Sequence, residues 1–266
     1  MQQKNKLFAI FGNPVTHSLS PLMHNYALEG LGINGCYTRY QLIDPKALKE
    51  KFLQLNLDAI NITVPHKEAA YQACDEIRGI AKEIGAINTI VKENDKLIGY
   101  NTDAPGFFKC ATSLGKIENI LILGAGGTAK ALAAIFRDKK ISVTILNRSA
   151  SRLEYFKQKN YSCYTWEDFE TNTFDLVVNT TSAGLQDEYL PVDEKLLNDI
   201  LNHAKYAIDV IYNKNTPFLQ MAKEHDLPIK DGSDMLLFQG VYAFELFFNK
   251  RYKEEEILPF MQKAFT

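Results

Sequence analysis

The chain has 266 residues, of which 46% are hydrophobic and 23% are charged, and its formal net charge at pH 7 is −2. This is the composition of a globular protein, and the length suits one large domain or two modest ones. The basic residues are scattered rather than clustered, so we expect no nucleic-acid partner and no attraction to an anionic membrane.

Segments typical of strands and helices alternate along the first hundred residues, which favours an α/β fold. Ser20-Pro21 predicts an N-cap followed by the first residue of a helix, and Asp44-Pro45 repeats this signal. The predicted elements here are a strand at 7–11, a helix from 20 to about 30, a strand at 37–43, a helix from 45 to about 55, a strand at 59–64 and a hairpin of 88–92 with 96–99.

A helix from about 103 to 114 leads into a second α/β run. Its predicted strands are 119–123, 143–146, 176–179 and 207–210, and its first helix is 128–139. Two further helices are predicted at 235–248 and from about 254. The fold class is therefore α/β with two lobes, and a cleft between them is the usual place for a small substrate.

The cysteines and histidines indicate a compartment and argue against a metal. The cysteines at 36, 74, 110 and 163 form no C-x-x-C pair, which favours reduced thiols in a cytoplasmic protein. No histidine spacing matches a metal site, so no metal is expected. We also expect neither a signal peptide nor a membrane span, because no apolar segment has the required length or position.

Residues 120–129 carry the most specific motif, G-x-G-x-x-A, placed between a strand and a helix. Gly124 permits a sharp turn, Gly126 lets the backbone approach a pyrophosphate, and Ala129 lets the helix pack closely on the strand. The N-terminus of that helix offers N–H groups and partial positive charge to phosphates. This turn predicts a dinucleotide site, whose expected contacts are Gly124, Ala125, Gly126, Gly127, Thr128 and Ala129.

The end of the next strand predicts which dinucleotide binds. NAD-binding units usually place an acid there to accept from the ribose 2′-OH, but this chain has Arg148 between Asn147 and Ser149. A guanidinium can bind a 2′-phosphate that a carboxylate would repel. The expected cofactor is therefore NADP.

Polar loops follow the strands of the first lobe, where an open α/β sheet binds its ligand. They lie at 12–25, 61–67, 85–89 and 99–103, and their hydroxyls and amides suit a small polyhydroxylated acid. Lys67 and Asp103 are the titratable candidates, because a ketone reduced by hydride needs a proton donor at its oxygen. Taken singly, Lys67 could be a solvated charge and Asp103 a helix cap.

The chain closely resembles shikimate dehydrogenases over essentially its whole length. The matching segments are GNPVTHSLSPLMHN at 12–25, NITVPHK at 61–67, GAINTIV at 85–91, NTDAPG at 101–106, GAGGTAKA at 124–131, NRS at 147–149, NTTSAG at 179–184, DVIYNKNTPFL at 209–219 and DGSDMLLFQGVYAFEL at 231–246. The resemblance implies reversible NADPH-dependent reduction of 3-dehydroshikimate to shikimate, on the route to chorismate and aromatic amino acids. It also implies a substrate-binding domain at 1–103, completed by helices at 235–266, and a Rossmann-type NADP-binding domain at 104–234.

The resemblance further implies roles for individual residues. Lys67 corresponds to the catalytic lysine, partnered by Asp103, and Tyr212 to a tyrosine near the substrate. Gly232 and Met235 correspond to positions that line the nicotinamide pocket, and Ile211 is a further expected cofactor contact. The implied substrate contacts are Ser18 and Ser20 for the carboxylate and Asn61, Thr63, Asn88, Asp103 and Gln239 for the hydroxyls. One departure is Asn213-Lys214, where many members have a proline after the tyrosine.

Two alternatives stay open from the sequence. A dual quinate/shikimate dehydrogenase using NAD should carry an acid near Arg148, and a non-catalytic NADP-binding sensor should lack the lysine and aspartate pair. Both arguments favour the NADP-dependent enzyme. The sequence does not distinguish a monomer from a homodimer.

Overall fold

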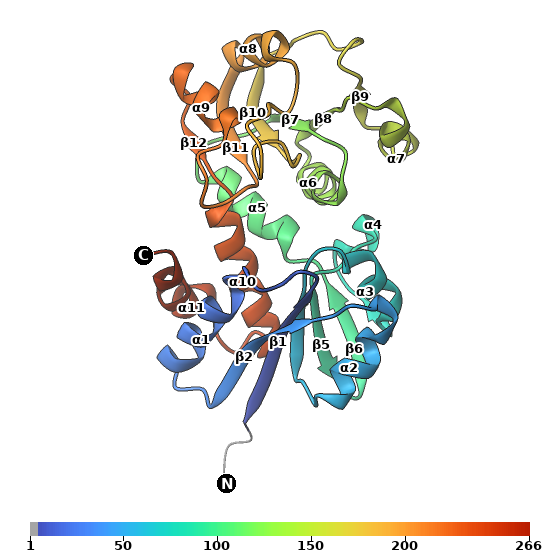
Figure 1. Ribbon diagram of the computed structural model, residues 1–266, viewed down its shortest axis with the longest axis vertical. Coiled ribbons are helices and arrows are strands. Elements are labelled where there is room, and N and C mark those ends of the chain that lie inside the picture. Colours follow the sequence, from blue (N-terminus) through green and yellow to red (C-terminus); the bar gives the residue numbers. More distant parts are fainter. Residues whose placement is uncertain (1–4) are drawn as a thin grey trace. The chain divides into compact units, whose positions relative to one another are not determined.

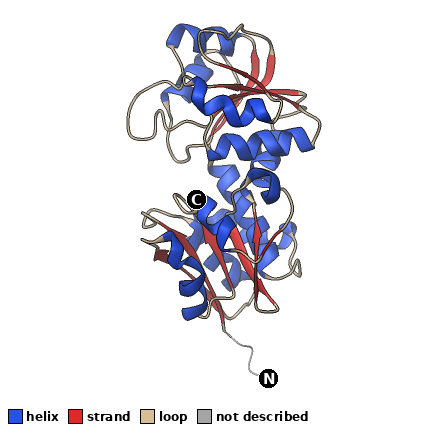
Figure 2. Cartoon of the chain, turned by 90° about the vertical axis from the view of Figure 1, so that its right-hand side faces the viewer, coloured by secondary structure: helices blue, strands red, loops and turns tan. Residues whose placement is uncertain are grey.

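The structure of the protein is a computed structural model that describes residues 5–266. Its internal contacts divide it into two compact units, one ending at Gly106 and resuming at Leu237, the other running from Phe107 to Leu236. Both boundaries lie within helices, α5 (Asp103–Thr112) and α10 (Ser233–Phe247). Each unit has helices packed on a six-stranded sheet, which confirms the predicted two-lobed α/β class (Figures 1 and 2).

The sheet of the first unit is mixed. Its order is β2-β1-β3-β5-β6-β4, with β5 antiparallel to both neighbours and the other pairs parallel. The predicted hairpin turn at Asn94 and Asp95 is present, with φ of 48° and 63°, as a two-residue turn between strands requires. The strands are β1 (Lys6–Gly12), β2 (Gly35–Gln41), β3 (Ala59–Ile62), β4 (Glu76–Ile77), β5 (Thr89–Glu93) and β6 (Lys96–Tyr100).

Helices cover both faces of this sheet. Successive side chains of β1 point to opposite faces, and apolar side chains on each face have to be buried. Phe8 stacks on Phe247 of α10, while Phe11 belongs to a core cluster with Phe52 of the opposite layer. Figure 1 shows α10, α1 and α11 along one face and α2 and α3 along the other. The helices are α1 (Ser20–Gly30), α2 (Leu48–Gln54) after a single 3₁₀ turn (Pro45–Ala47), α3 (Lys67–Ala73), α4 (Ala81–Ile84) and α11 (Glu254–Met261) with a final 3₁₀ turn (Gln262–Phe265).

The start of α1 differs from the prediction. The helix begins at Ser20 itself, so Ser20 is not its N-cap. The Ser18 hydroxyl instead accepts the Ser20 backbone N–H at 3.2 Å, which satisfies a donor at the helix start. Asp44, in contrast, caps its helix as predicted by accepting from the Lys46 N–H at 2.9 Å.

The sheet of the second unit is entirely parallel and doubly wound. The strands lie in the order β12-β11-β10-β7-β8-β9. Successive strands are added on one side of β7 up to β9 and on its other side from β10 onward, and dinucleotides bind such sheets at this switch between β7 and β10. The strands are β7 (Asn119–Leu123), β8 (Ser142–Leu146), β9 (Ser162–Tyr164), β10 (Phe174–Asn179), β11 (Ala204–Asp209) and β12 (Ile229–Lys230). The helices are α6 (Gly127–Asp138), α7 (Glu154–Gln158) after a 3₁₀ turn (Ala150–Leu153), α8 (Glu194–Asn202) and α9 (Pro217–Glu224).

The sequence analysis missed the shorter elements, among them β4, β9, β12 and the helices α3, α4, α7, α8 and α9. Within residues 5–266, no helix is both long and apolar enough to cross a membrane.

Candidate active site

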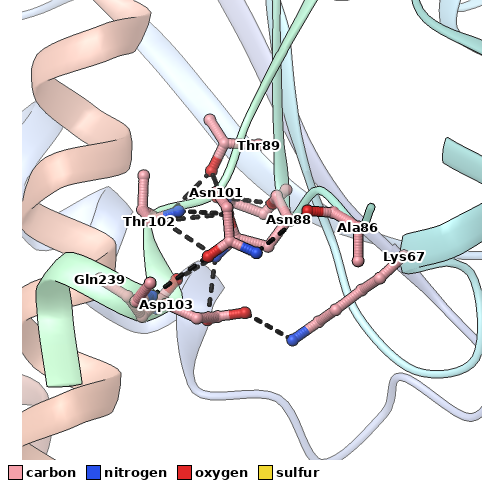
Figure 3. Close-up of polar contacts among 10 residues, drawn as sticks. Lys67, Ala86, Asn88, Thr89, Asn101, Thr102, Asp103 and Gln239 are labelled. Atoms are coloured by element: carbon pink, nitrogen blue, oxygen red, sulfur yellow. Dashed lines mark hydrogen bonds and ion pairs between the residues drawn. The ribbon is translucent and has the colours of Figure 1, made fainter. Parts of the chain in front are cut away.

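Lys67 and Asp103 form an ion pair at one edge of the first sheet. Lys67 begins α3, beyond the end of β3, and Asp103 begins α5, beyond the end of β6. The Lys67 Nζ donates to Asp103 Oδ2 at 2.6 Å, and the two side chains point toward each other (Figure 3). Their side chains are 31% and 14% exposed, so a ligand can reach the pair although much of the solvent is excluded.

Asp103 does not cap its own helix. Asn101 does so, because its Oδ1 accepts the Ala104 N–H at 3.1 Å. The second oxygen of Asp103 accepts from the Asn88 Nδ2 at 2.9 Å. The helix-cap interpretation of Asp103 is therefore wrong, and its carboxylate is directed at the lysine and the amide.

Asn88 is the centre of this network. It is 2% exposed, and its Oδ1 accepts from the Thr102 backbone N–H at 2.8 Å and from the Thr89 hydroxyl at 3.0 Å. These two donors fix the orientation of the amide, so that its Nδ2 faces Asp103 and, at 2.9 Å, the Thr102 hydroxyl (Figure 3).

Gln239 enters the network from α10, 151 positions further along the chain than Asn88. The Asn88 Nδ2 donates to its Oε1 at 3.4 Å. The backbone of α10 approaches α5 closely here, because a Cβ added to Gly106 would lie 2.7 Å from the Gln239 nitrogen. Glycine at position 106 therefore permits the approach that brings Gln239 to the site.

Tyr37 links the remaining polar residues of this unit. Its hydroxyl donates to Asn61 Oδ1 at 2.8 Å and also bonds the side chain of Ser20, and burial raises the pKa of Tyr37 well above its ordinary value. The Asn61 Nδ2 donates to the Asn88 carbonyl at 3.1 Å and to the Thr89 hydroxyl at 3.0 Å. Because both of its N–H groups are engaged, Asn61 can offer a ligand an acceptor only.

The loops that follow β1 and β3 lie together. The Asn13 N–H donates to the Val64 carbonyl at 3.1 Å, and the Arg39 guanidinium holds the Ser18 carbonyl, with its Nη2 at 2.6 Å. Ser18 is buried, and Thr63 is half-buried. Within the first unit, the structure thus links Lys67, Asp103, Asn88, Asn61 and Gln239 directly and Ser20 through Tyr37.

The histidines of this region are not candidates for proton transfer. His66 is buried and bonds the Leu42 carbonyl through Nε2 at 2.7 Å. His24 is buried and stacks on the rings of both Tyr37 and Phe247, and neither of its ring nitrogens has a hydrogen-bond partner among the described residues. Burial lowers the pKa of His24 to about 3, so it stays neutral at physiological pH.

A cavity of about 910 Å³ lies at the carboxyl ends of β7, β8 and β10 in the second unit. Its wall includes six of the predicted cofactor residues: Gly124, Ala125, Gly126, Asn147, Arg148 and Ser149. Sequence reasoning missed Arg152, Trp166 and the loop from Thr180 to Ala183, although the N-T-T-S-A-G segment directly after a strand could have indicated that loop.

The turn at this cavity has the geometry that the motif predicts. Gly124 has φ of 106°, and a Cβ there would lie 2.9 Å from the Thr180 hydroxyl oxygen. No side chain caps α6, so the N–H groups at its start are available to an anion. Ala129 is fully buried against the sheet.

Arg148 is exposed on the wall of the cavity, and within residues 5–266 it forms no ion pair. Two acids on the wall, Asp187 and Glu188, are engaged elsewhere. Asp187 accepts from the backbone N–H groups of Gly184 and Tyr189, which hold the pKa of its carboxyl below the ordinary value, and Glu188 lies 3.6 Å from Lys214. The cavity therefore keeps a cation available for a phosphate.

The other predicted cofactor residues are not on the wall of this cavity. Gly127 and Thr128 are in the first turn of α6, and the Gly232 N–H donates to the Ile211 carbonyl at 3.0 Å. Met235 lies in the first turns of α10. Tyr212 belongs to the second unit, half-buried, and is followed by Asn213 with φ of 56°. Among residues 5–266, there is no group of three or more metal-ligating side chains.

The doubly wound sheet with a nucleotide-sized cavity, together with the shielded lysine and aspartate pair, defines a dinucleotide-dependent oxidoreductase. A family model described as the shikimate dehydrogenase substrate binding domain matches residues 10–90. The shikimate dehydrogenase (NADP(+)) of Helicobacter hepaticus is 46% identical over 93% of this chain and 92% of its own, and that of Helicobacter pylori is 45% identical over 92% and 93%. The chain belongs to the shikimate dehydrogenase family.

Two solved structures have the same fold over nearly the whole chain. Shikimate dehydrogenase from Aquifex aeolicus superposes with a TM-score of 0.84 at 33% identity, covering 100% of this chain and 99% of its own. The Thermus thermophilus enzyme, solved in complex with NADP(H) and shikimate, has a TM-score of 0.85 at 32% identity, covering 97% and 99%.

Proposed function

We propose that the protein catalyses the reversible NADPH-dependent reduction of 3-dehydroshikimate to shikimate. The observation that carries this proposal is the 2.6 Å pair of Lys67 and Asp103 inside a network of oriented amides and hydroxyls. The family relationship supports the substrate and the cofactor.

The polar side chains of the first unit suit the substrate. The hydroxyls of Ser18 and Ser20 would hold its carboxylate, with Tyr37 bonded to Ser20. Asn61 would accept from a substrate hydroxyl, since its donors are engaged. The remaining proposed contacts are Thr63, Asn88, Asp103 and Gln239 from the first unit and Tyr212 from the second.

The second unit suits NADP. The start of α6 would hold the pyrophosphate, and Arg148, with Asn147 and Ser149, would hold the 2′-phosphate. We assign the nicotinamide end to Ile211, Gly232 and Met235. When bound, the reduced cofactor supplies the hydride that the keto carbon accepts.

Lys67 then completes the reduction. Negative charge collects on the former keto oxygen, and the Lys67 ammonium stabilises it and donates a proton, which yields the hydroxyl. Asp103 orients the ammonium through one oxygen, and Asn88 holds the other oxygen. The neutral lysine regains a proton from solvent, since its side chain is 31% exposed.

Shikimate-dependent reduction of NADP, followed by absorbance, tests the proposal. We expect turnover with shikimate and NADP, and a Michaelis constant for NADP well below that for NAD. Quinate and NAD as the better pair would favour the dual enzyme, and binding of NADP without any turnover would favour the sensor. Asp103→Asn should lower both turnover and substrate affinity, because it removes an acceptor as well as the partner of Lys67.

We also propose a cytoplasmic location, which the free thiols at Cys36, Cys74, Cys110 and Cys163 support. A monomer and a homodimer both agree with this function, and sedimentation analysis distinguishes them.

A further inference from the structure

Trp166, the chain's single tryptophan, lies on the wall of the cofactor cavity beside Arg148. The Arg148 guanidinium carbon lies over the indole ring, 6.0 Å from its centroid. This distance is within the range of a cation–π interaction. Among residues 5–266, the Arg148 side chain forms no ion pair and no hydrogen bond, so the contact with the ring is what orients it.

The register of β8 and β9 places Arg148 and Trp166 next to each other. β8 and β9 pair in parallel with Leu146 opposite Tyr164, and the Asn147 N–H extends the pairing to the Tyr164 carbonyl at 3.1 Å. Arg148 and Trp166 each lie two residues beyond that pair, on adjacent loops. The indole also packs against the core cluster of the second unit, so the ring is anchored while the guanidinium is exposed.

An aromatic partner has a specific advantage for an arginine that must receive a phosphate. A carboxylate would also orient the guanidinium, but it would neutralise the charge and repel the 2′-phosphate. An aromatic ring attracts the cation through its quadrupole and leaves the net charge unchanged. The ring also restricts the rotamers of Arg148 before the cofactor binds, so less conformational entropy is lost on binding.

We infer that Trp166 is a positioning residue for Arg148 and thereby increases the preference for NADP over NAD. This inference rests on the proposed NADP clamp, because it concerns how Arg148 is held for the 2′-phosphate. Trp166 is not assigned any contact with the reacting atoms.

The test compares Michaelis constants for NADP and NAD in Trp166→Leu, Trp166→Phe and Arg148→Ala. Trp166→Leu should raise the constant for NADP by about two- to fivefold, as expected from loss of an exposed cation–π contact, and leave that for NAD unchanged. Trp166→Phe should retain part of the effect. Adding Trp166→Leu to Arg148→Ala should change nothing further, since the ring then has no guanidinium to hold.

Tyr189→Leu is the matched control, because Tyr189 lines the same cavity and is 73% exposed. Its NADP-to-NAD ratio should stay at the wild-type value. An equal rise of both constants in Trp166→Leu would overturn the inference and assign the ring to cavity shape, and unchanged constants would overturn it as well. If Arg148→Ala keeps the wild-type NADP preference, the proposed clamp itself fails, and this inference fails with it.

Discussion

Asn101 caps α5 with its side-chain oxygen, 3.1 Å from the Ala104 nitrogen, two residues before the aspartate that pairs with Lys67. Its Nδ2 donates to the Ala86 carbonyl at 3.1 Å, which ties the cap to the loop before Asn88 (Figure 3). This division of roles leaves both oxygens of Asp103 directed at the site. A neighbouring side chain thus performs the structural task that Asp103 could have performed.

Asn101→Ala should therefore weaken both the fold and the site. We expect a loss of about 1 kcal/mol in the free energy of unfolding, as for other N-caps. Activity should fall more than this loss of stability alone predicts, because Asp103 can then turn back to cap the helix. Asn101→Asp, which keeps a capping oxygen, should restore much of the stability in denaturant unfolding. Full activity in Asn101→Ala would contradict the argument.

Ser18→Ala and Ser20→Ala should raise the Michaelis constant for shikimate more than they lower turnover. The carboxylate lies away from the reacting carbon, so this contact should be equally strong in the ground and transition states. Steady-state kinetics check the prediction, with Ser113→Ala, on an exposed serine that bonds the Cys110 carbonyl, as the control. Unchanged shikimate affinity in both variants would remove the serines from the site.

Arg148→Ala should raise the Michaelis constant for NADP and have little effect on that for NAD, because only NADP carries the 2′-phosphate. Charge-assisted contacts are typically worth about 1.5–3 kcal/mol, so an increase of at least tenfold is expected. Initial-rate measurements with each cofactor test this. Arg137→Ala, on the same unit, is a suitable control, and equal efficiency of both cofactors in the wild-type protein would refute the assignment.

His24 should make the fold sensitive to acid. The unfolded chain binds a proton near pH 6.5, but burial lowers the pKa of His24 in the folded state to about 3. Between these two pH values the unfolded state binds more protons than the folded state. The free energy of unfolding should therefore decrease by about 1.4 kcal/mol for each unit by which the pH is lowered in this range.

His24→Phe keeps an aromatic ring stacked on Tyr37 and Phe247 but cannot titrate. Its free energy of unfolding should therefore depend less on pH, and at neutral pH it should not fall, because two unpartnered buried nitrogens are removed. Urea unfolding at several pH values checks this. His203→Phe, at an exposed histidine, should keep the wild-type slope, and an unchanged slope in His24→Phe would contradict the account.

The long elements were predictable because each has its own local signal. The glycine turn at Gly124, the capping aspartate Asp44 and the hairpin at Asn94-Asp95 all follow from local backbone chemistry. The edge strands β4 and β12 have two residues each and depend on tertiary pairing. They are too short to show a periodic pattern from which they could be predicted.

The candidate site was predictable in its titratable residues but not in its supporting contacts. Lys67 and Asp103 are visible as polar residues after strands. Tyr37 is not, because a tyrosine in a strand is ordinarily a packing residue. Its link to Ser20 and Asn61 depends on the three-dimensional pairing of β1 with β2 and β3. Trp166 likewise becomes informative only through the register of β8 and β9.

The central claim is that Lys67 donates the proton, and single-turnover oxidation of bound NADPH by 3-dehydroshikimate tests it most directly. Lys67→Ala should slow this step by about 10²–10⁴-fold, the usual contribution of general acid catalysis, with NADPH affinity nearly unchanged. Lys49→Ala, which removes the same charge from an exposed ion pair with Asp75, should react at the wild-type rate. A near-normal rate in Lys67→Ala would show that the proton comes from another group.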